Sequence, residues 1–162
     1  MKLLTHATAM AAITAAGAMV SIVSAQSPAA TQTVVRAGSQ PAIDGAAANF
    51  TGKVRVDPVF PATADAPFSA GYVTFDPGAR SAWHTHPAGQ RLIVTAGNGR
   101  TGVWGGPVVE IKAGDAVLCP PGVKHWHGAA PGTAMTHLAL TGQKDGANVH
   151  WLEHVTDVQY GR

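Results

Sequence analysis

The sequence contains one cysteine, few charged residues and no strongly basic cluster. With Cys119 alone, no disulfide can form within the chain, so packing must stabilise the fold. Cys119 lies in an apolar run before two prolines, where we expect a buried, unreactive thiol. Only 12% of the residues are charged and the net charge is +2. We therefore expect neither nucleic acid nor an anionic membrane surface as a partner.

After about Ala46, no segment repeats apolar residues at helical spacing over three turns. Instead, short runs rich in Val, Ile, Thr and aromatic residues alternate with Gly and Pro, which is typical of a β-sandwich or β-barrel. The predicted strands are Lys53–Phe60, Ala70–Phe75, Arg91–Ala96, Gly102–Trp104, Val108–Ile111, Ala116–Cys119, His125–Ala129 and Met135–Thr141.

Gly- and Pro-containing turns are expected between these strands. One of them, Ala96-Gly97-Asn98-Gly99, would separate two predicted strands. A short tail is the exception to the β pattern, because Thr156 can cap a single helical turn over Asp157–Gln159. We predict one all-β domain over residues 46–162.

The first 25 residues have the pattern of a cleavable secretory signal. Lys2 gives a weakly basic start, Ala9–Val23 carries no charge, and small residues precede a cut after Ala25. An uncleaved anchor is the alternative, but the run is shorter and richer in alanine than a span of about twenty apolar residues. We expect an exported, periplasmic or secreted protein, free of the membrane after cleavage, with residues 26–45 as a flexible leader.

Three histidines and a glutamine form a candidate metal site. His84 and His86 share one face of an extended strand, because residues i and i+2 point to the same side. Gln90 follows a Pro-Ala-Gly turn that can return the chain beside that face. His125 begins another strand after a Pro-Pro-Gly turn. A single histidine is usually an ordinary surface or hydrogen-bonded residue, but this combination predicts the ligands of one ion.

Two spaced motifs carry a family resemblance. They read Gly78-x5-His84-x-His86-x3-Gln90-x6-Gly97 and Gly114-x5-Pro120-x-Gly122-x2-His125, with sixteen residues between them. They resemble the two cupin motifs, in order. The resemblance implies a small, single-domain jelly-roll β-barrel with a metal in its mouth, paired into a homodimer or a higher homo-oligomer. Gln90 stands where most cupins have Glu, and Ala129 where the second motif often ends in Asn.

The glutamine changes the charge of the predicted site. Three neutral imidazoles and a neutral amide leave a divalent ion its full double charge, which strengthens it as a Lewis acid and favours an anionic ligand. The same set gives less support to a trivalent ion, and so weakens a cycle in which dioxygen oxidises iron or manganese. A decayed or purely structural site is the alternative, although a Gln oxygen is a competent ligand for oxygen-preferring ions.

Further histidines lie near the predicted ligands. His127 follows His125 by two residues and should face the same interior. If His137 also faces inward, a neutral imidazole beside a dication would have a lowered pKa and could accept a proton. A hydrogen-bonded core histidine is an equal alternative for His137. We expect a structural role for His154 and find no signal for His150.

Longer segments resemble the bacterial cupin hydroxynitrile lyases. The resemblance covers Arg36 to the end, and the matching segments are Phe50–Asp57, Gly78–Pro87, Leu92–Gly97, Lys124–Pro131, Thr133–Ala139 and Trp151–Tyr160, together with Gln90. That family is implied to bind manganese and to cleave cyanohydrins reversibly to an aldehyde and hydrogen cyanide.

The same resemblance implies a role for each site residue. The metal ligands would be His84, His86, Gln90 and His125. His137 would be the catalytic base and cyanide partner, and His127 a second catalytic residue that lines the pocket. Gly71, Val73 and Thr141 fall at the pocket walls of that family. Gly71 and Thr141 differ from one member of it, and Gly71 adds room.

Two other functions remain open, namely a cupin dioxygenase acting on a small phenol or diketone, and a non-catalytic module that binds a metal or a small ligand. Fe(II), Zn(II) and Ni(II) are alternatives to Mn(II). A chain exported unfolded takes its metal outside the cytoplasm, where zinc and copper compete for nitrogen sites.

Overall fold

The computed structural model describes residues 31–161, of which residues 34–161 belong to one compact unit. The predicted signal, residues 1–25, lies outside the described residues. Within residues 31–161, no helix has the length and hydrophobicity needed to cross a membrane.

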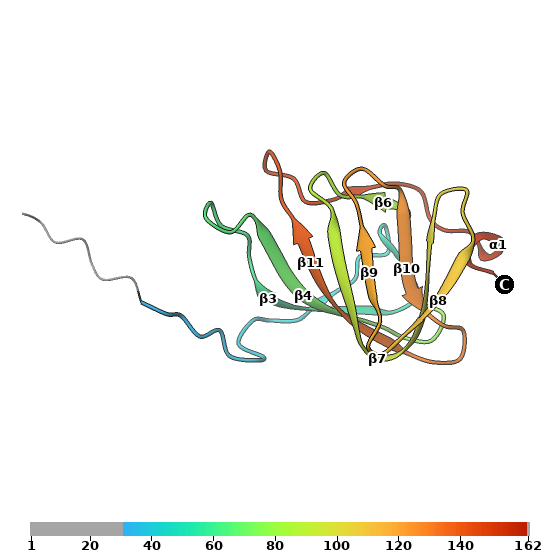
Figure 1. Ribbon diagram of the computed structural model, residues 1–162. Coiled ribbons are helices and arrows are strands. Elements are labelled where there is room, and N and C mark those ends of the chain that lie inside the picture. The colour runs from blue at the N-terminus through green and yellow to red at the C-terminus, as the bar shows by residue number, and fades with distance from the viewer. Residues whose placement is uncertain (1–30, 162) are drawn as a thin grey trace, which may run out of the picture. The chain divides into compact units, whose positions relative to one another are not determined.

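The regular secondary structure of the described residues is almost entirely β, as predicted (Figure 1). The elements are β1 Ile43–Asp44, β2 Phe50–Thr51, β3 Val54–Phe60, β4 Phe68–Phe75, β5 Arg80–Ser81, β6 His84–Thr85, β7 Gln90–Val103, β8 Val108–Lys112, β9 Ala116–Cys119, β10 His125–Ala129, β11 Met135–Gly142, β12 His150–Trp151 and α1 Asp157–Tyr160. Strand β1 lies within residues 26–45, the predicted flexible leader. Its residues Ile43 and Asp44 pair with Val56 and Arg55 of β3, so this end of the segment belongs to the sheet.

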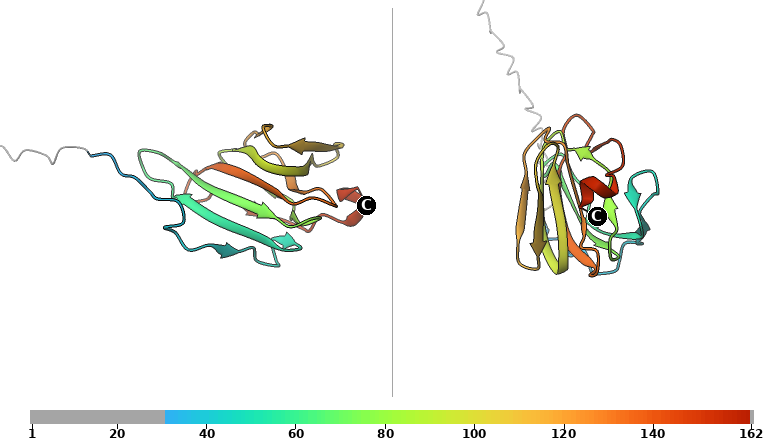
Figure 2. Two further views of the ribbon diagram at one scale, coloured as in Figure 1. Left: turned by 90° about the horizontal axis from the view of Figure 1, so that it is seen from below. Right: turned by 90° about the vertical axis from the view of Figure 1, so that its right-hand side faces the viewer.

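The strands form one antiparallel sheet that curls on itself (Figure 2). Its main path runs β1-β3-β4-β11-β7-β10-β5-β2. Strands β8 and β9 pair with β7, β6 pairs with β10, and β12 pairs with β6. The curl creates two facing layers. One layer contains β3, β4, β11 and β9, the other contains β5, β6, β10 and β8, and β7 belongs to both.

The predicted turn at residues 96–99 is wrong, because β7 runs through it as a single strand of fourteen residues. Its first half pairs with β11 and β9, and its second half with β8 and β10. Gly97 has a φ of +74° and lies where β7 changes layers. Glycine here bends the strand at a corner of the sheet instead of ending it.

The interior follows the alternation of the strands. Gln90, Leu92 and Val94 of β7 are buried while the residues between them are exposed. The largest core cluster fills one end of the curled sheet, where Phe75 and Met135 are fully buried. Histidines occupy inward positions further along, so the same alternation that builds the core also directs the candidate site residues inward.

Strand β10 is buried on both of its faces. Trp126 points away from the histidines and packs with Trp83, Val155 and Tyr160, which belong to a second core cluster under the C-terminal tail. The tail crosses the outside of this layer and shields β10 from water. Cys119 is also buried, and burial raises the pKa of its thiol to about 11, which agrees with the predicted unreactive thiol.

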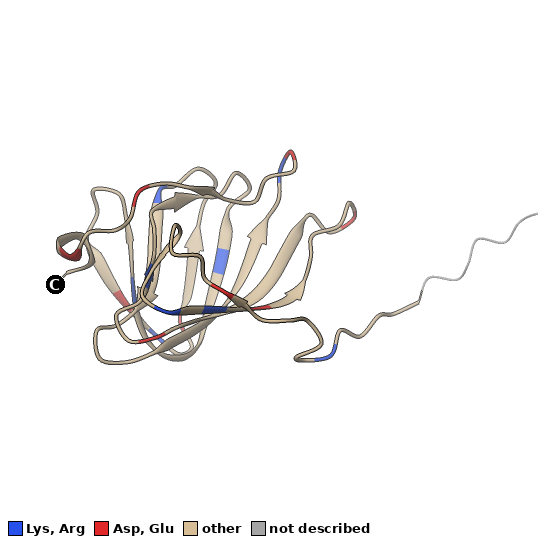
Figure 3. Cartoon of the chain, turned by 180° about the vertical axis from the view of Figure 1, so that it is seen from behind, with Lys and Arg blue, Asp and Glu red and all other residues tan. Residues whose placement is uncertain are grey.

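The tail ends in the predicted helical turn. Thr156 is the N-cap of α1, and its side chain accepts from the Gln159 backbone while the Gln159 side chain accepts from the Thr156 backbone. Arg80, only 4% exposed, anchors the tail by donating twice to Val155 O and once to Asp157. Charged residues elsewhere are scattered over the described chain (Figure 3).

We expect Gly97→Ala to destabilise the protein far more than Gly114→Ala. Both glycines have positive φ, so each alanine costs about 1–2 kcal/mol of conformational strain. A Cβ at Gly97 would also collide with the carbonyl of Ala134, whereas a Cβ at Gly114 meets open space. Urea denaturation should show a loss of more than about 3 kcal/mol at Gly97 and of about 1–2 kcal/mol at Gly114. Equal losses would contradict the close approach of β7 to β11.

Candidate metal centre and substrate pocket

Three strands bring the predicted ligands together inside the curled sheet. His84 in β6 pairs directly with His125, the first residue of β10. His86 follows β6, and Gln90 begins β7. The ring centroids of His84 and His125 are 4.3 Å apart, and His86 lies 5.0 Å from His84 and 5.4 Å from His125. All four side chains are buried.

Backbone carbonyls fix the orientation of the three imidazoles. The Nδ1 atom of His84 contacts Ala82 O at 2.9 Å, that of His125 contacts Val123 O at 2.9 Å, and that of His86 contacts Asn148 O. Because a carbonyl only accepts, each Nδ1 must carry the proton and each neutral Nε2 keeps its lone pair. In metal-ligating histidines, a carbonyl that accepts from one ring nitrogen imposes this tautomer and leaves the other nitrogen free for the ion.

Gln90 is oriented by Thr141. The Nε2 of Gln90 donates to Thr141 Oγ1 at 3.1 Å, which identifies the other amide atom, Oε1, as the one that faces the histidines. Oε1 lies 3.5 Å from His125 Nε2. Both atoms are acceptors in the tautomer described above, so no proton can bridge them.

The arrangement fits a divalent metal ion. His86 Nε2 is buried and has no hydrogen-bond partner in the structure. His125 Nε2 and Gln90 Oε1 face each other as two acceptors. Buried acceptors without donors are costly, and a cation shared between them removes the cost. Imidazole nitrogens with an amide oxygen suit Mn, Fe, Ni and Zn ions, so the donor set does not choose among them.

His127 extends the group of nitrogen donors. One ring nitrogen from each of His84, His125 and His127 lies within 4.8 Å of the other two, so these three buried histidines could hold a metal. The structure therefore brings His127 as close to the centre as the predicted ligands. His127 Nε2 is also buried without a partner. What separates it from the others is its Nδ1, which contacts another histidine instead of a backbone carbonyl.

His127 and His137 form a buried pair. His127 Nδ1 and His137 Nε2 are 3.1 Å apart, and the two ring centroids are 4.7 Å apart. One proton lies between these two nitrogens, so one imidazole donates and the other accepts. Phe75 packs against both rings, at centroid distances of 5.7 Å and 5.6 Å. His137 faces inward and is fully buried, which decides its orientation, left open by the sequence.

Burial keeps the whole cluster neutral. It lowers the pKa of His125 to about 4 and that of His137 to about 4, with backbone hydrogen bonds opposing each shift. Burial, and then the neighbouring histidines, hold the pKa values of His84 and His127 well below the ordinary range. Burial also lowers the pKa of His86. Neutral imidazoles are the form that binds metals and accepts protons.

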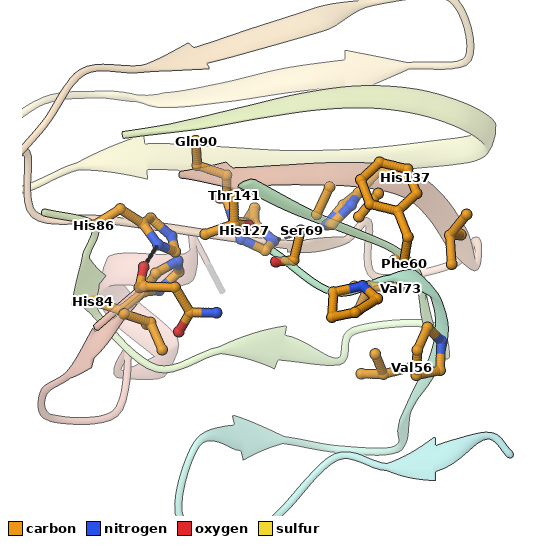
Figure 4. A pocket seen from close by; sticks show the side chains of 18 of the residues that line it. Val56, Phe60, Ser69, Val73, His84, His86, Gln90, His127, His137 and Thr141 are labelled. Atoms are coloured by element: carbon orange, nitrogen blue, oxygen red, sulfur yellow. Dashed lines mark hydrogen bonds between the residues drawn. The ribbon is translucent and has the colours of Figure 1, made fainter. Parts of the chain in front are cut away.

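A cavity of about 480 Å³ opens beside the histidines (Figure 4). His84 and His86 lie at one end, and Val56, Phe60 and Val73 at the other. The predicted wall residues Gly71, Val73 and Thr141 all line it, as do His127, His137 and Gln90. Its walls are largely apolar, which is the usual make-up of a small-molecule site.

Several site residues were not anticipated from the sequence. Asn148 supplies only a backbone carbonyl to His86, so its side-chain type carries no signal. Phe50 and Trp151 line the pocket from short strands, and Trp151 pairs with His84. Phe60 lies at the end of a predicted strand, but nothing in the sequence indicates that it faces a cavity. His154 contacts Thr51 at 3.3 Å, which agrees with the expected structural role.

A curled antiparallel sheet with inward histidines and bare Nε2 atoms defines a metal-binding cupin. A family model described as Cupin domain matches residues 71–141. The chain belongs to the cupin family. An (R)-mandelonitrile lyase from Granulicella tundricola is 58% identical over 129 residues, which cover 80% of this chain and 98% of that protein.

Solved structures agree with the assignment. A cupin-like protein from Thermotoga maritima aligns with a TM-score of 0.67 and 38% identity, covering 80% of this chain and 95% of its own. A cupin-2 domain protein from Rhodospirillum rubrum aligns with a TM-score of 0.61 over 80% of this chain and 84% of its own. That protein is only 18% identical, so it shows the shared fold alone.

We expect Thr141→Val to weaken metal binding about 10–100-fold, because the Gln90 amide loses the acceptor that orients it. Thr136→Val on the same strand is the matched control, since Thr136 bonds Thr74 away from the cluster. Competition with a chelator measures the affinity for Mn(II) in both variants. Unchanged affinity in Thr141→Val would show that Gln90 needs no such anchor.

We expect the metal-free protein to lose stability as the pH falls from about 6.5 toward 4. A histidine with a lowered pKa is neutral in the fold, whereas the unfolded chain takes up its proton in this window. Stability is therefore full above about pH 6.5 and falls by about 1.4 kcal/mol per pH unit for each such group.

His137→Leu tests this expectation, because it removes a group whose pKa burial lowers to about 4. Denaturation at several pH values should give a slope smaller by about one proton than that of the parent. If the stability of the parent and of His137→Leu changed with pH at the same slope, His137 would not be a neutral, buried group.

Proposed function

We propose that the protein is a metal-dependent hydroxynitrile lyase that cleaves an aromatic cyanohydrin, such as (R)-mandelonitrile, reversibly to an aldehyde and hydrogen cyanide. One observation carries the proposal. A buried, neutral imidazole pair, His127 and His137, lies beside the metal-ligand group and lines the same cavity. The identity to an (R)-mandelonitrile lyase supports this reaction and this enantiomer.

The cavity suits the substrate in its polarity. The apolar wall over Val56 and Val73 accepts an aryl group, while the histidines and Gln90 meet the hydroxyl and nitrile end. Apolar walls exclude water from the reacting end, which strengthens each polar interaction there. They also limit hydration of the aldehyde and stray proton transfer.

His137 is the proposed base. Because its pKa is about 4, it is neutral near pH 7 and can accept the cyanohydrin hydroxyl proton. The O–H electron pair becomes the carbonyl π bond, and the carbon–carbon bond pair leaves with cyanide. Cyanide then takes the proton from the imidazolium, giving hydrogen cyanide and a neutral histidine. His127 Nδ1 lies 3.1 Å from His137 Nε2. The hydrogen bond between them lets the two rings share the positive charge.

The residues present fit a divalent ion held by His84, His86, Gln90 and His125, for which we favour Mn(II). Bound there, the ion supplies Lewis-acid stabilisation of negative charge at the substrate oxygen. The protein residues fix the ligand orientation, through the three backbone carbonyls and Thr141. His127, although close, is assigned to the proton pair, because a histidine holds its Nδ1.

The proposal includes export and a homo-oligomeric state. The apolar N-terminal segment with its small-residue end supports export. Exposed apolar side chains on the outer face of the sheet, including Leu118, Val109 and Val103, support contact with a second copy. The N-terminal residue of protein recovered from its producing cells, and light scattering of the purified protein, test these two points.

We expect the Mn(II)-loaded protein to release cyanide from racemic mandelonitrile with consumption of the R enantiomer. His137→Ala should lower kcat by about 10²–10⁴, the usual contribution of a positioned base. A chelated sample should show no release above background. Cyanide assay with chiral chromatography of the residual substrate provides the measurement.

His154→Ala is the control, because His154 lies outside the cavity and bonds Thr51. Full activity in His137→Ala would remove the assigned base. No metal-dependent release at all would remove the lyase assignment, and oxygen uptake by an Fe(II)-loaded sample would then test a dioxygenase.

A further inference from the structure

One wall of the cavity is built from cross-strand rows of three residues. Val56, Val73 and His137 lie opposite one another on β3, β4 and β11. Pro58, Gly71 and Ala139 form the next row. All six residues line the cavity. The second row has the smallest side chains, so the wall recedes there.

Gly71 is the centre of this recess. A Cβ added at Gly71 would meet its nearest neighbours at 3.5 Å or more, which is ordinary van der Waals contact. The backbone φ there lies outside the positive range that requires glycine. Neither packing nor conformation therefore demands glycine at this position. Its effect is to leave space in the cavity beside Ala139.

The recess leads to an apolar end formed by β3 and the residues after it. Val59, Phe60 and Pro61 line this end. The pairing of β3 with β4 shifts between Pro58 and Phe60, and such a bulge redirects side chains. Phe60 is held by an edge-on contact with Phe68 at a centroid distance of 5.8 Å. A fixed aromatic wall favours a second aromatic ring beside it.

The cavity is large for a single-ring substrate. At about 480 Å³ it falls within the roughly 300–1,000 Å³ that accommodate drug-sized ligands. A cyanohydrin with one ring, placed with its polar end at the histidines, would leave the recess and the Phe60 end to water. Water against these apolar walls is unfavourable, so a ligand that displaces it binds more tightly.

We propose that this pocket selects two-ring substrates, namely aromatic cyanohydrins with an aryloxy substituent such as 3-phenoxymandelonitrile, and that Gly71 determines this selectivity. The inference rests on the proposed lyase function. The cyanohydrin carbon lies at the histidines, the first ring lies against Val73, and the distal ring passes over Gly71 to Phe60. A larger side chain at Gly71 would project into that path.

Activity with two substrates tests the proposal. We expect the Mn(II)-loaded protein to cleave 3-phenoxymandelonitrile with a kcat/KM roughly tenfold or more above that for mandelonitrile, mainly through a lower KM. In Gly71→Leu the ratio of the two kcat/KM values should fall about tenfold or more. Tyr72→Leu is the matched control, because the exposed Tyr72 is absent from the cavity lining and should leave the ratio unchanged.

A binding measurement separates this inference from the lyase proposal. Calorimetric titration of the Mn(II)-loaded protein should show 3-phenoxybenzoate binding about tenfold more tightly than benzoate, with the difference lost in Gly71→Leu. If mandelonitrile is cleaved but neither preference is seen, the two-ring inference is overturned and the lyase stands. If no cyanide is released and the binding preference is present, the pocket assignment stands and the reaction is wrong.

Discussion

The structure depends on three hydrogen bonds from histidine Nδ1 atoms to backbone carbonyls. They direct the bare Nε2 atoms of His84, His86 and His125 to one region inside the sheet. Each buried acceptor without a donor costs about 1–3 kcal/mol, so the metal-free cluster costs a substantial part of a domain's stability. Binding of Zn(II) contributes about 10–16 kcal/mol in zinc-finger peptides, and a bound ion of comparable affinity would exceed this cost. The fold can therefore maintain a cluster that is unfavourable by itself.

The C-terminal tail allows the histidine cluster to be buried in so small a chain. Without it, β10 would face water on the side of Trp126, and the strand carrying His125 and His127 would lie at the surface. Arg80 ties the tail through the Val155 carbonyl, and β12 pairs with the strand of His84. Segments distant in sequence therefore combine to desolvate one cluster, and that desolvation lowers the histidine pKa values.

The strands and the inward direction of His84, His86 and His125 could be predicted from local patterns, because alternation and turn residues act over a few positions. The bend in β7 could not, since Gly97 is equally suited to a turn and to a sheet corner. Nor could the inward orientation of His137, because the face that it shares with Met135 and Ala139 is no more apolar in sequence than the opposite face, which carries Leu138 and Leu140. Carbonyl partners such as Asn148 O have no side-chain signature and appear only when the chain is folded.

The side chains of the candidate site are all electrically neutral. Gln90 replaces a carboxylate, Thr141 fixes its amide, and burial keeps every histidine of the cluster uncharged. The described residues that line the cavity include no Asp, Glu, Lys or Arg. A carboxylate at position 90 would cancel one unit of the ion's charge and would also stabilise the protonated form of nearby histidines. Glutamine avoids both effects, so in the proposed reaction cyanide would leave as an anion while His137, the proposed base, would remain weak enough to return its proton.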